Sequence, residues 1–296
     1  MNPELSVIIT AKDRENQDLK DLLLSIGDQT YKNYEVDVVT EGDSESAKAI
    51  GVRRARGEFI CILASDNFLN DTSFFEKHIS ALKAIPIATG AYPFRYFYHL
   101  DDTPLNRYFA LMGCNDPIPF YLGKCDKLPY YRNIPYRLTR DQVPTIGDNG
   151  FFIRKDLLLK ADLDHYYHID VCEDLRLKGY TFYILTDSSI WHKTAKDFRA
   201  FFGKRLKYAD KFAVPQRRWQ MVRTKDIPRL VWFIFCTITC IQPLWISFLG
   251  YRKIKDKAWF LHLPVCWATL GVYTLWVLKR LTLCSAKTNS GSSTKV

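Results

Sequence analysis

Residues 5–10 read Leu-Ser-Val-Ile-Ile-Thr, a short apolar run rich in β-branched side chains, which predicts a buried strand. The chain then alternates between helical and extended patterns. We expect helices over residues 16–27 and 44–55, and strands over residues 34–39 and 59–63. This alternation is typical of an α/β protein with a doubly wound, Rossmann-like sheet, which binds ligands at the carboxyl ends of its strands.

The elements expected further along the chain are less regular. A helix is predicted over residues 73–84, a strand over 85–89 and another strand over 181–185. Residues 101–146 are dense in proline and tyrosine, and we interpret them as an irregular insertion over the active face.

The overall composition is that of a globular protein, with 296 residues of which 47% are hydrophobic and 25% charged. It excludes a disordered chain, a collagen and a small disulfide scaffold. The eight cysteines occur singly, with no C-x-x-C pair, which favours a reducing compartment. The formal net charge of +10 indicates an anionic partner, which is a nucleic acid, a membrane surface or a phosphorylated substrate.

Two stretches near the C-terminus, residues 230–250 and 258–278, each contain 21 residues without a charged side chain. About 20 apolar residues cross the roughly 30 Å hydrocarbon core of a bilayer, so residues 230–281 are expected to form two transmembrane helices. The basic residues that flank them favour a multi-pass membrane protein whose catalytic domain faces the cytoplasm. The connecting loop is also basic, which leaves shallow, re-entrant or interfacial helices open, as well as a buried hairpin of a soluble protein.

Residues 192–229 carry most of the surplus charge. From residue 192 to 227 there are eleven lysines and arginines against three aspartates, interleaved with aromatic residues. Such a segment directly before a membrane helix is typical of one that lies on anionic lipid headgroups. This position argues against the rival interpretation, a nucleic-acid interface, and no nucleic-acid partner is expected. Residues 282–296 are polar and are expected to form a disordered tail.

Carboxylates follow the expected strands where phosphate-binding glycines are absent. The sequence contains neither G-x-G-x-x-G after the first strand nor G-x-x-x-x-G-K-[ST]. Instead, Glu41 and Asp43 follow the second strand and Asp66 follows the third. Carboxylates there can hydrogen-bond a nucleoside or hold a divalent cation against a diphosphate. Each one taken alone is equally typical of a turn.

Together these motifs resemble the family-2 glycosyltransferases, whose GT-A fold is a doubly wound mixed sheet. The resemblance covers residues 1–191, about 190 residues. Six segments carry it: residues 6–15 (the opening strand and turn), 25–36 (S-x-x-x-Q-T-Y-x-N-x-E-V), 38–44 (V-V-D-D-G-S), 63–67 (D-x-D), 147–154 (a Gly-rich acceptor loop) and 173–175 (E-D). It implies an inverting transfer from a nucleotide sugar. With the membrane helices, the chain is similar to enzymes that act on polyprenyl-phosphate or lipid-linked glycan acceptors.

The resemblance also implies roles for individual residues. The donor-binding residues would be Thr10, Ala11, Arg14, Glu41, Asp43, Arg54, Ser65 and Asp66. The acceptor-binding residues would be Asp148, Asn149, Gly150 and Glu173. Asp174, at the start of a helix, would be the general base, unless the acceptor is a phosphate and no proton has to be removed. Asp66 and His192 would bind Mg²⁺ or Mn²⁺ against the leaving diphosphate, assisted by basic residues such as Arg199, Arg205 and Lys207. The structural alternatives are a charge in a solvated helix turn for Asp174 and a surface residue for His192.

Three positions depart from the family pattern. Ala64 replaces the first aspartate of D-x-D, and Thr40-Glu41 replaces the usual acidic pair. Residues 216–219 fall one residue short of the Q-x-x-R-W motif of processive synthases, so processivity is not inferred. Ala64 supports the alternative of a non-catalytic relative that binds nucleotide sugar or scaffolds a membrane complex. A nucleotidyltransferase is disfavoured because residues 10–15 contain no glycine.

Overall fold

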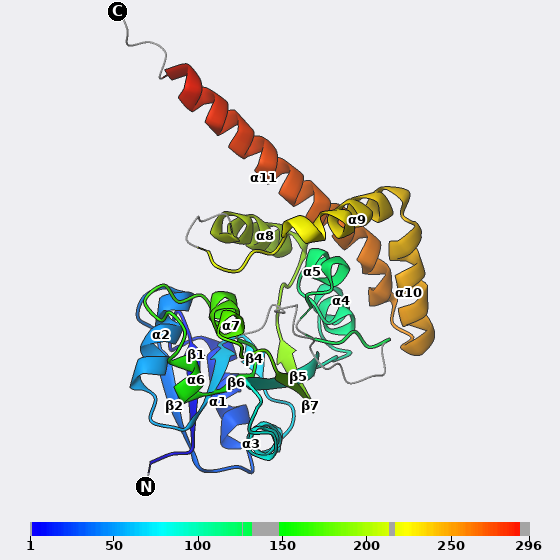
Figure 1. Ribbon diagram of the computed structural model, residues 1–296. Coiled ribbons are helices and arrows are strands. Elements are labelled where there is room, and N and C mark those ends of the chain that lie inside the picture. The colour runs from blue at the N-terminus through cyan, green and yellow to red at the C-terminus, as the bar shows by residue number, and fades with distance from the viewer. Residues whose placement is uncertain (1, 126, 132–147, 213–216, 291–296) are drawn as a thin grey trace, which may run out of the picture.

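The computed structural model describes residues 2–125, 127–131, 148–212 and 217–290. Its centre is a seven-stranded sheet in the order β2-β1-β3-β6-β5-β7-β4, with helices on both faces (Figure 1). The strands are β1 (Leu5–Thr10), β2 (Tyr34–Val39), β3 (Phe59–Ala64), β4 (Asn67–Phe68), β5 (Gly90–Tyr96), β6 (Phe151–Arg154) and β7 (Tyr183–His192). The helices of this part are α1 (Gln17–Gly27), α2 (Ser44–Arg54), α3 (Phe74–Ala84), α4 (Pro104–Met112), α5 (Pro117–Leu122), α6 (Lys155–Leu158) and α7 (His168–Leu177).

The sheet is mixed, as expected for the fold class. β1 pairs in parallel with β2 and β3, and β5 pairs in parallel with β7, whereas β6 and β4 run antiparallel to their neighbours. The register places Thr10 beside both Val39 and Ala64. The carboxyl ends of β1, β2, β3 and β7 therefore meet at one edge of the sheet.

Alternating side chains bury both faces of the sheet. Along β1, Ile8 packs toward α2 and α7, while Val7 and Ile9 pack toward α1 and α3. Gly51 lets α2 approach β1 closely, because a Cβ atom there would lie 2.4 Å from the side chain of Ile8. This packing holds the loops at the strand ends in place.

Two sequence expectations between the third strand and the acceptor loop are wrong. The strand expected over residues 85–89 begins at Gly90, because the preceding residues form the turn that ends α3. The expected irregular insertion at 101–146 contains α4 and α5. Their prolines occupy the first turn of each helix, and glycines in the left-handed conformation end them at 113 and 123, so proline and glycine mark helix ends rather than a loop. Residues 132–147 lie outside the described residues.

The first expected membrane helix, residues 230–250, is not a single helix. Two helices, α9 (Ile227–Thr239) and α10 (Ile241–Lys253), meet at Cys240 with a bend of 82°. Pro243 has no N–H to donate to the carbonyl of residue 239, so a continuous helix would lose a hydrogen bond and clash with the proline ring. Cys240 adopts a positive φ of 61° at the break.

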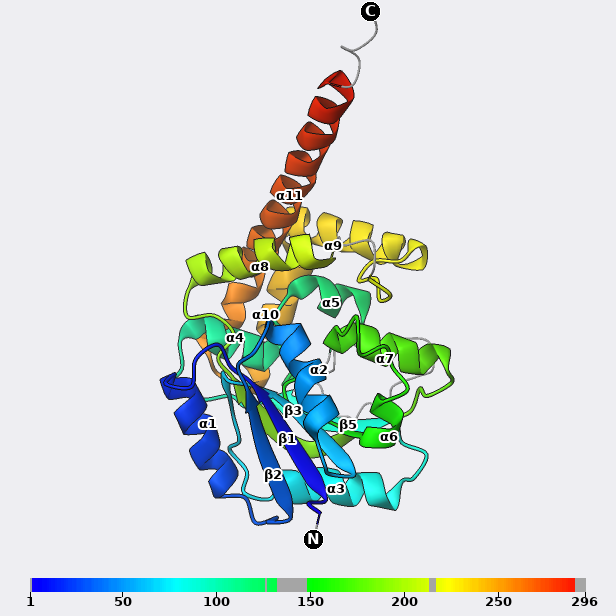
Figure 2. The same cartoon turned by 90° about the vertical axis from the view of Figure 1, so that its left-hand side faces the viewer.

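The second expected membrane helix has a counterpart in the structure. A 3₁₀ turn, η2 (Lys257–Leu261), leads into α11 (His262–Ser290), and residues 257–282 are long and apolar enough to cross a membrane. The helix extends to Ser290, beyond residue 282 where the tail was expected to begin, and residues 291–296 lie outside the described residues. Figure 2 shows α11 projecting away from the sheet domain.

The C-terminal helices share a core with the insertion. α8 (Phe198–Phe212), η2 and α11 pack on α4 through Phe201, Trp259 and Val265, and α9 packs on α5 through Phe233. A short 3₁₀ turn, η1 (Thr224–Asp226), precedes α9. α8 and α9 lie across one end of the sheet domain (Figures 1 and 2). Residues 192–229 were expected to lie on the membrane surface. Part of this segment therefore also packs into the protein's own hydrophobic core.

Candidate active site at the strand ends

The carboxyl edge of the sheet brings Asp66 and His192 together. Asp66 follows β3, and His192 is the last residue of β7. β4 pairs with β7 so that Asn67 stands opposite His192. The imidazole Nε2 lies 3.5 Å from Asp66 Oδ2. Two residues far apart in the sequence thus form one pair, as the resemblance implies.

The environment of Asp66 keeps its carboxylate ionised. Burial alone would raise the pKa of this group, but the opposing effects of His192 and Lys204 outweigh it and lower the pKa to about 2. Its Oδ1 atom is buried and has no hydrogen-bond partner among the described residues. A buried anionic oxygen without a donor is costly in the protein alone and suits a bound cation.

Asp66 and His192 can hold a divalent metal ion only if a bound substrate and waters supply further ligands to the metal. Within the described ranges, no group of three or more His, Cys, Asp or Glu side chains is placed to hold a metal. Asp66 and His192 supply one carboxylate and one imidazole. Mg²⁺ is commonly held by one or two carboxylates, with substrate phosphates and waters completing its coordination, so this donor set matches a metal carried on a diphosphate.

Lys204 of α8 belongs to the same site and was missed in the sequence. Burial lowers the pKa of its ammonium group, whereas the negative charges of Asp66 and Asp148 act in the opposite direction. Its neighbour Arg205 pairs with Asp116 at 3.2 Å, while Arg199 and Lys207, also expected to assist the diphosphate, are exposed. The helical spacing of Phe201, Arg205 and Tyr208 marks the inward face beside Lys204 and could have indicated it. We call Asp66, Asp148, His192 and Lys204 the Asp66 cluster.

The acceptor loop of the resemblance lies against the same edge. Asn149 and Gly150 both adopt positive φ, of 53° and 83°. The Asn67 side-chain amide donates to Asn149 Oδ1 at 3.0 Å, and the Gly150 N–H donates to the Ile62 carbonyl at 3.0 Å. These bonds fix the loop beside β3 and β4. Gly147, the first residue of the motif, lies outside the described residues.

A second group of buried charges adjoins Asp148. Lys48 Nζ lies 3.3 Å from both a Glu45 oxygen and Asp148 Oδ2, and His168 Nδ1 lies 3.0 Å from Glu45. Burial opposes the charge of each group, but the opposite charges prevail, so the pKa of Glu45 and of Asp148 is lowered and that of Lys48 is raised. Lys48, Gly51 and Val52 share one helical face, a pattern that marks Lys48 as buried.

The E-D motif lies on α7, but not at its start. Asp174 is in the second half of the helix, and Glu173 is buried beside it. The Arg218 guanidinium donates to Asp174 Oδ1 at 2.5 Å, and the Asp162 backbone N–H donates to Oδ2 at 3.0 Å. Both carboxylate oxygens therefore have partners.

The other acidic residues of this helix are paired in the same way. Arg217 contacts Asp170 at 2.9 Å, and Glu173 binds both Arg176 and Arg223. These three carboxylates, Asp170, Glu173 and Asp174, form what we call the α7 acidic cluster. Three of the four arginines that pair with it come from residues 217–223. This segment contains residues 217–219 of the shortened Q-x-x-R-W-like motif, and Gln216 lies outside the described residues.

The remaining expected donor residues occupy the rim of the strand ends. The Ser65 N–H donates to the Thr10 carbonyl at 3.2 Å, and that of Ala11 donates to the Val39 carbonyl at 3.1 Å, which holds the three strand ends together. The Arg14 side chain donates to the Val38 carbonyl at 3.0 Å.

Three more of these residues make local contacts. Asp43 caps α2, where its side chain accepts from the backbone N–H groups of Glu45 and Ser46. Glu41 and Arg54 form an exposed ion pair at 3.0 Å. The contacts that the structure gives these residues are internal to the fold.

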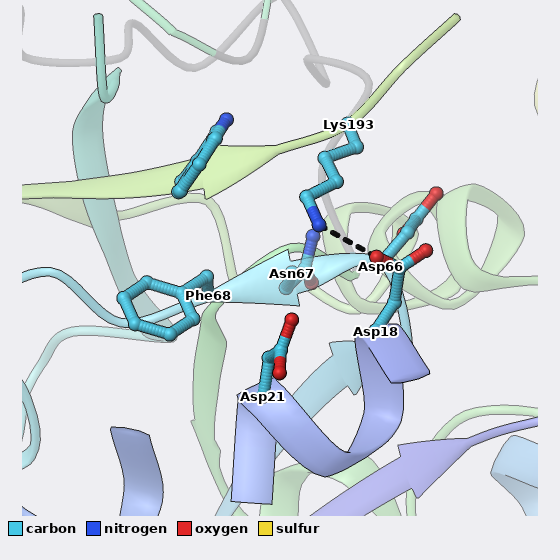
Figure 3. Close-up of a pocket in the computed structure, with 7 residues that line it drawn as sticks. Asp18, Asp21, Asp66, Asn67, Phe68 and Lys193 are labelled. Carbon is cyan, nitrogen blue, oxygen red and sulfur yellow. Dashed lines mark hydrogen bonds and ion pairs between the residues drawn. The ribbon is translucent and has the colours of Figure 1, made fainter. Parts of the chain in front are cut away.

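A small cavity of about 100 Å³ opens beside Asp66 (Figure 3). It is lined by Asp18, Asp21, Asp66, Asn67, Phe68, Trp191 and Lys193. Lys193 reaches across to Asp18, with 2.6 Å between the charged atoms, as the dashed line in Figure 3 shows. Pockets for small ligands are commonly about 300–1,000 Å³, so the cavity can hold only part of a nucleotide sugar.

The chain matches no protein-family model and no curated protein sequence. Among solved structures it is similar to the mannosyltransferase PcManGT from Pyrobaculum calidifontis in complex with GDP-Man and Mn²⁺, at 15% identity and a TM-score of 0.47, over 97% of this chain and 81% of that one. It is also similar to S. aureus TarS 1-349, alone and in complex with UDP-GlcNAc, at 12% identity and a TM-score of 0.42, over 88% of this chain and 90% of that one. With every one of these TM-scores below 0.5, no conclusion about fold family, donor or metal rests on them.

Proposed function

We propose that this protein is an inverting, family-2-type glycosyltransferase that moves a sugar from a nucleotide-sugar donor to a polyprenyl- or glycan-lipid acceptor at a membrane. The observation that carries the proposal is Asp66, an ionised carboxylate with one unpartnered buried oxygen, beside His192 at the strand ends. The resemblance of residues 1–191 to family-2 glycosyltransferases supports a donor diphosphate at this edge.

On the donor side, Asp66 and His192 would hold Mg²⁺ or Mn²⁺, which supplies positive charge to the leaving diphosphate. Lys204 lies within the electrostatic reach of Asp66 and would add a second positive charge from α8. The hydrogen bonds among the ends of β1, β2 and β3 keep these groups in a fixed position, so little reorganisation is needed when charge develops on the leaving group.

On the acceptor side, two residues are candidates for the base. The resemblance assigns Asp174, which would have to exchange its contact with Arg218 for the acceptor hydroxyl. His168 is favoured by geometry, because it begins α7 beside the Asp66 cluster. Nδ1 lies 3.0 Å from the Glu45 carboxylate, which can only accept, and 3.5 Å from the Lys48 ammonium, which can only donate. In the tautomer that donates to Glu45, Nε2, 4.0 Å from Asp148, would be able to take a proton.

The acceptor is proposed to be lipid-linked because α9, α10 and α11 expose large apolar side chains. Exposed fractions reach 53% for Phe235, 61% for Trp245 and 62% for Leu275. A soluble protein rarely leaves such a continuous apolar surface uncovered, and a bilayer would bury it. The acceptor would then reach the strand ends from the membrane side of the molecule.

The test is nucleotide release by the purified protein in detergent, with UDP-, GDP- and dTDP-sugars and with Mg²⁺, Mn²⁺ or a chelator. We expect release from one donor that requires metal and falls roughly 100-fold in Asp66→Asn. Asp164→Asn, at an exposed aspartate paired with Arg53, is the matched control and should behave as the wild type. Release that is unchanged in Asp66→Asn would overturn the role of Asp66, whereas no release from any donor by folded protein would favour the non-catalytic alternative.

The two candidate bases are separated in the same assay with membrane lipid extract added. The increase in release caused by lipid should be lost in Asp174→Asn if that residue is the base, and in His168→Asn if the histidine is. Inversion is checked by the anomeric configuration of the product in its NMR spectrum. Loss of the lipid effect in neither variant would indicate a phosphate acceptor, which needs no base.

A further inference from the structure

The bent pair α9–α10 is too short in each arm to cross a bilayer. Each helix has 13 residues, which at 1.5 Å per residue is about 20 Å, against a hydrocarbon core of roughly 30 Å. The two arms meet at 82° rather than in line. Their composition is nevertheless that of a membrane segment, and their outward side chains are apolar.

The N-terminal end of this pair is fixed to the sheet domain. Asp226, directly before α9, forms an ion pair with Lys124 at 2.6 Å, and both side chains are almost completely buried. Arg229 in the first turn of α9 donates to the Leu122 carbonyl at 2.8 Å. α9 therefore begins on the side of the membrane where the sheet domain lies.

The C-terminal end is fixed to the same domain. Asp256, in the loop after α10, accepts from Arg107 Nε at 2.8 Å and from the Tyr98 hydroxyl at 2.6 Å, and it is 6% exposed. Gly250 packs directly on the buried Trp259 indole, where a Cβ atom would lie 2.2 Å from the ring. The loop after α10 thus returns to the side from which α9 started.

We propose that α9–α10 is a re-entrant hairpin that enters and leaves the lipid leaflet next to the sheet domain. If α9–α10 crossed, roughly 30 Å of hydrocarbon would separate Asp256 from Arg107, which it contacts. The proposal rests on the membrane association put forward above and not on glycosyl transfer. It replaces the first span expected from the sequence, residues 230–250, with a segment whose two ends lie on the same side of the membrane.

The charges at the return point suit this topology. Residues 251–257 carry exposed Arg252, Lys253, Lys255 and Lys257. With two spans these four charges would lie on the far side, whereas a hairpin puts them on the same side as the basic residues of α8. Basic residues gather on the cytoplasmic side and near anionic headgroups, so one basic face toward one leaflet is the favoured arrangement.

The experiment maps sidedness in the full-length protein, expressed in bacterial membranes. A single extra cysteine is introduced by Asp28→Cys in the sheet domain, or by Lys255→Cys or Arg252→Cys in the loop, all at exposed positions. Sealed inverted and right-side-out vesicles are treated with a membrane-impermeant maleimide polymer. The mass added to each variant is compared with the mass added to the parent protein, which reports the labelling of the native cysteines.

We expect Asp28→Cys, Lys255→Cys and Arg252→Cys to react in the same vesicle orientation. Reaction of both loop cysteines opposite to Asp28→Cys would overturn the proposal in favour of a span. So would reaction of the loop cysteines only after detergent is added, because the hairpin places them in water. Donor turnover does not enter the readout, so this test fails or succeeds independently of the proposed enzyme activity.

Discussion

The Asp66 cluster and the α7 acidic cluster both contain carboxylates, but these are fully paired in the α7 acidic cluster and incompletely paired in the Asp66 cluster. In the α7 acidic cluster each carboxylate contacts an arginine, and Asp170 is held at 2.9 Å with two backbone N–H groups besides. In the Asp66 cluster one carboxylate oxygen is buried without a partner, and the imidazole is 3.5 Å from the other.

This difference indicates where a ligand is expected. Carboxylates that are fully paired stabilise the fold, because removing either partner leaves a buried charge. A buried carboxylate oxygen without a donor lacks a hydrogen bond that the folded protein could have made, and such atoms are commonly found where a substrate or metal completes the site. We therefore infer that the α7 acidic cluster holds residues 217–223 onto the sheet domain, while the Asp66 cluster binds the ligand.

The largest effect is expected in the paired cluster. Asp170→Asn leaves Arg217 buried without its counterion and should lower the free energy of unfolding by about 3–5 kcal/mol. The change is measured by thermal and urea unfolding in detergent. The double variant Asp170→Leu with Arg217→Met should recover much of the loss, since an apolar pair replaces the charges. Equal destabilisation in the double variant would mean that Asp170 acts through the backbone N–H groups it accepts from rather than through Arg217.

An intermediate effect is expected from Lys204 in the Asp66 cluster. Lys204→Gln removes a half-buried positive charge near Asp66 and should raise the KM for the nucleotide sugar about tenfold, with little change in unfolding temperature. Lys207→Gln, on the exposed face of the same helix, is the control and should leave KM unchanged. If both variants raise KM equally, the helix acts through its net charge, and Lys204 has no special position.

The fold was largely predictable from local patterns, and the errors have local causes. β1, β2, β3 and the first three helices follow apolar periodicity and capping residues that act within a few positions. α4 and α5 were missed because Pro104 and Pro117 indicate a loop, although proline in the first turn of a helix costs no hydrogen bond. The break at Cys240 was missed because the mean hydropathy of a segment does not show whether its helix is straight. Pro243 prevents one continuous helix from forming there.

The site was predictable only in part, because its electrostatics depend on distant segments. Asp66 and His192 could be found from strand ends and the family resemblance, and the structure brings them together. The pairing of Asp174 with Arg218 joins residues 44 positions apart through a segment without a local signal. Lys204 lay in a stretch interpreted as membrane-binding from its charge, its aromatic residues and its position before an expected membrane helix. Composition identifies such a segment as basic, but only packing shows which lysine faces inward.

The smallest effect is expected in the response of the Asp66 cluster to acid. The folded-state pKa of Asp66 is about 2, below the value of about 3.9 for an unfolded chain, so its ionised form stabilises the folded state. That contribution is fully present above roughly pH 4 and is lost as the pH falls toward 2. Asp66→Asn has no such group, so the difference in unfolding free energy between it and the wild type should be constant from pH 7 to about 4 and then change by on the order of 1 kcal/mol. Thermal unfolding of both proteins across this range measures it. A difference that already changes near pH 6 would mean that a histidine, not Asp66, controls the acid response of the site, and one that stays constant to pH 2 would mean that the carboxylate is not held ionised by its neighbours.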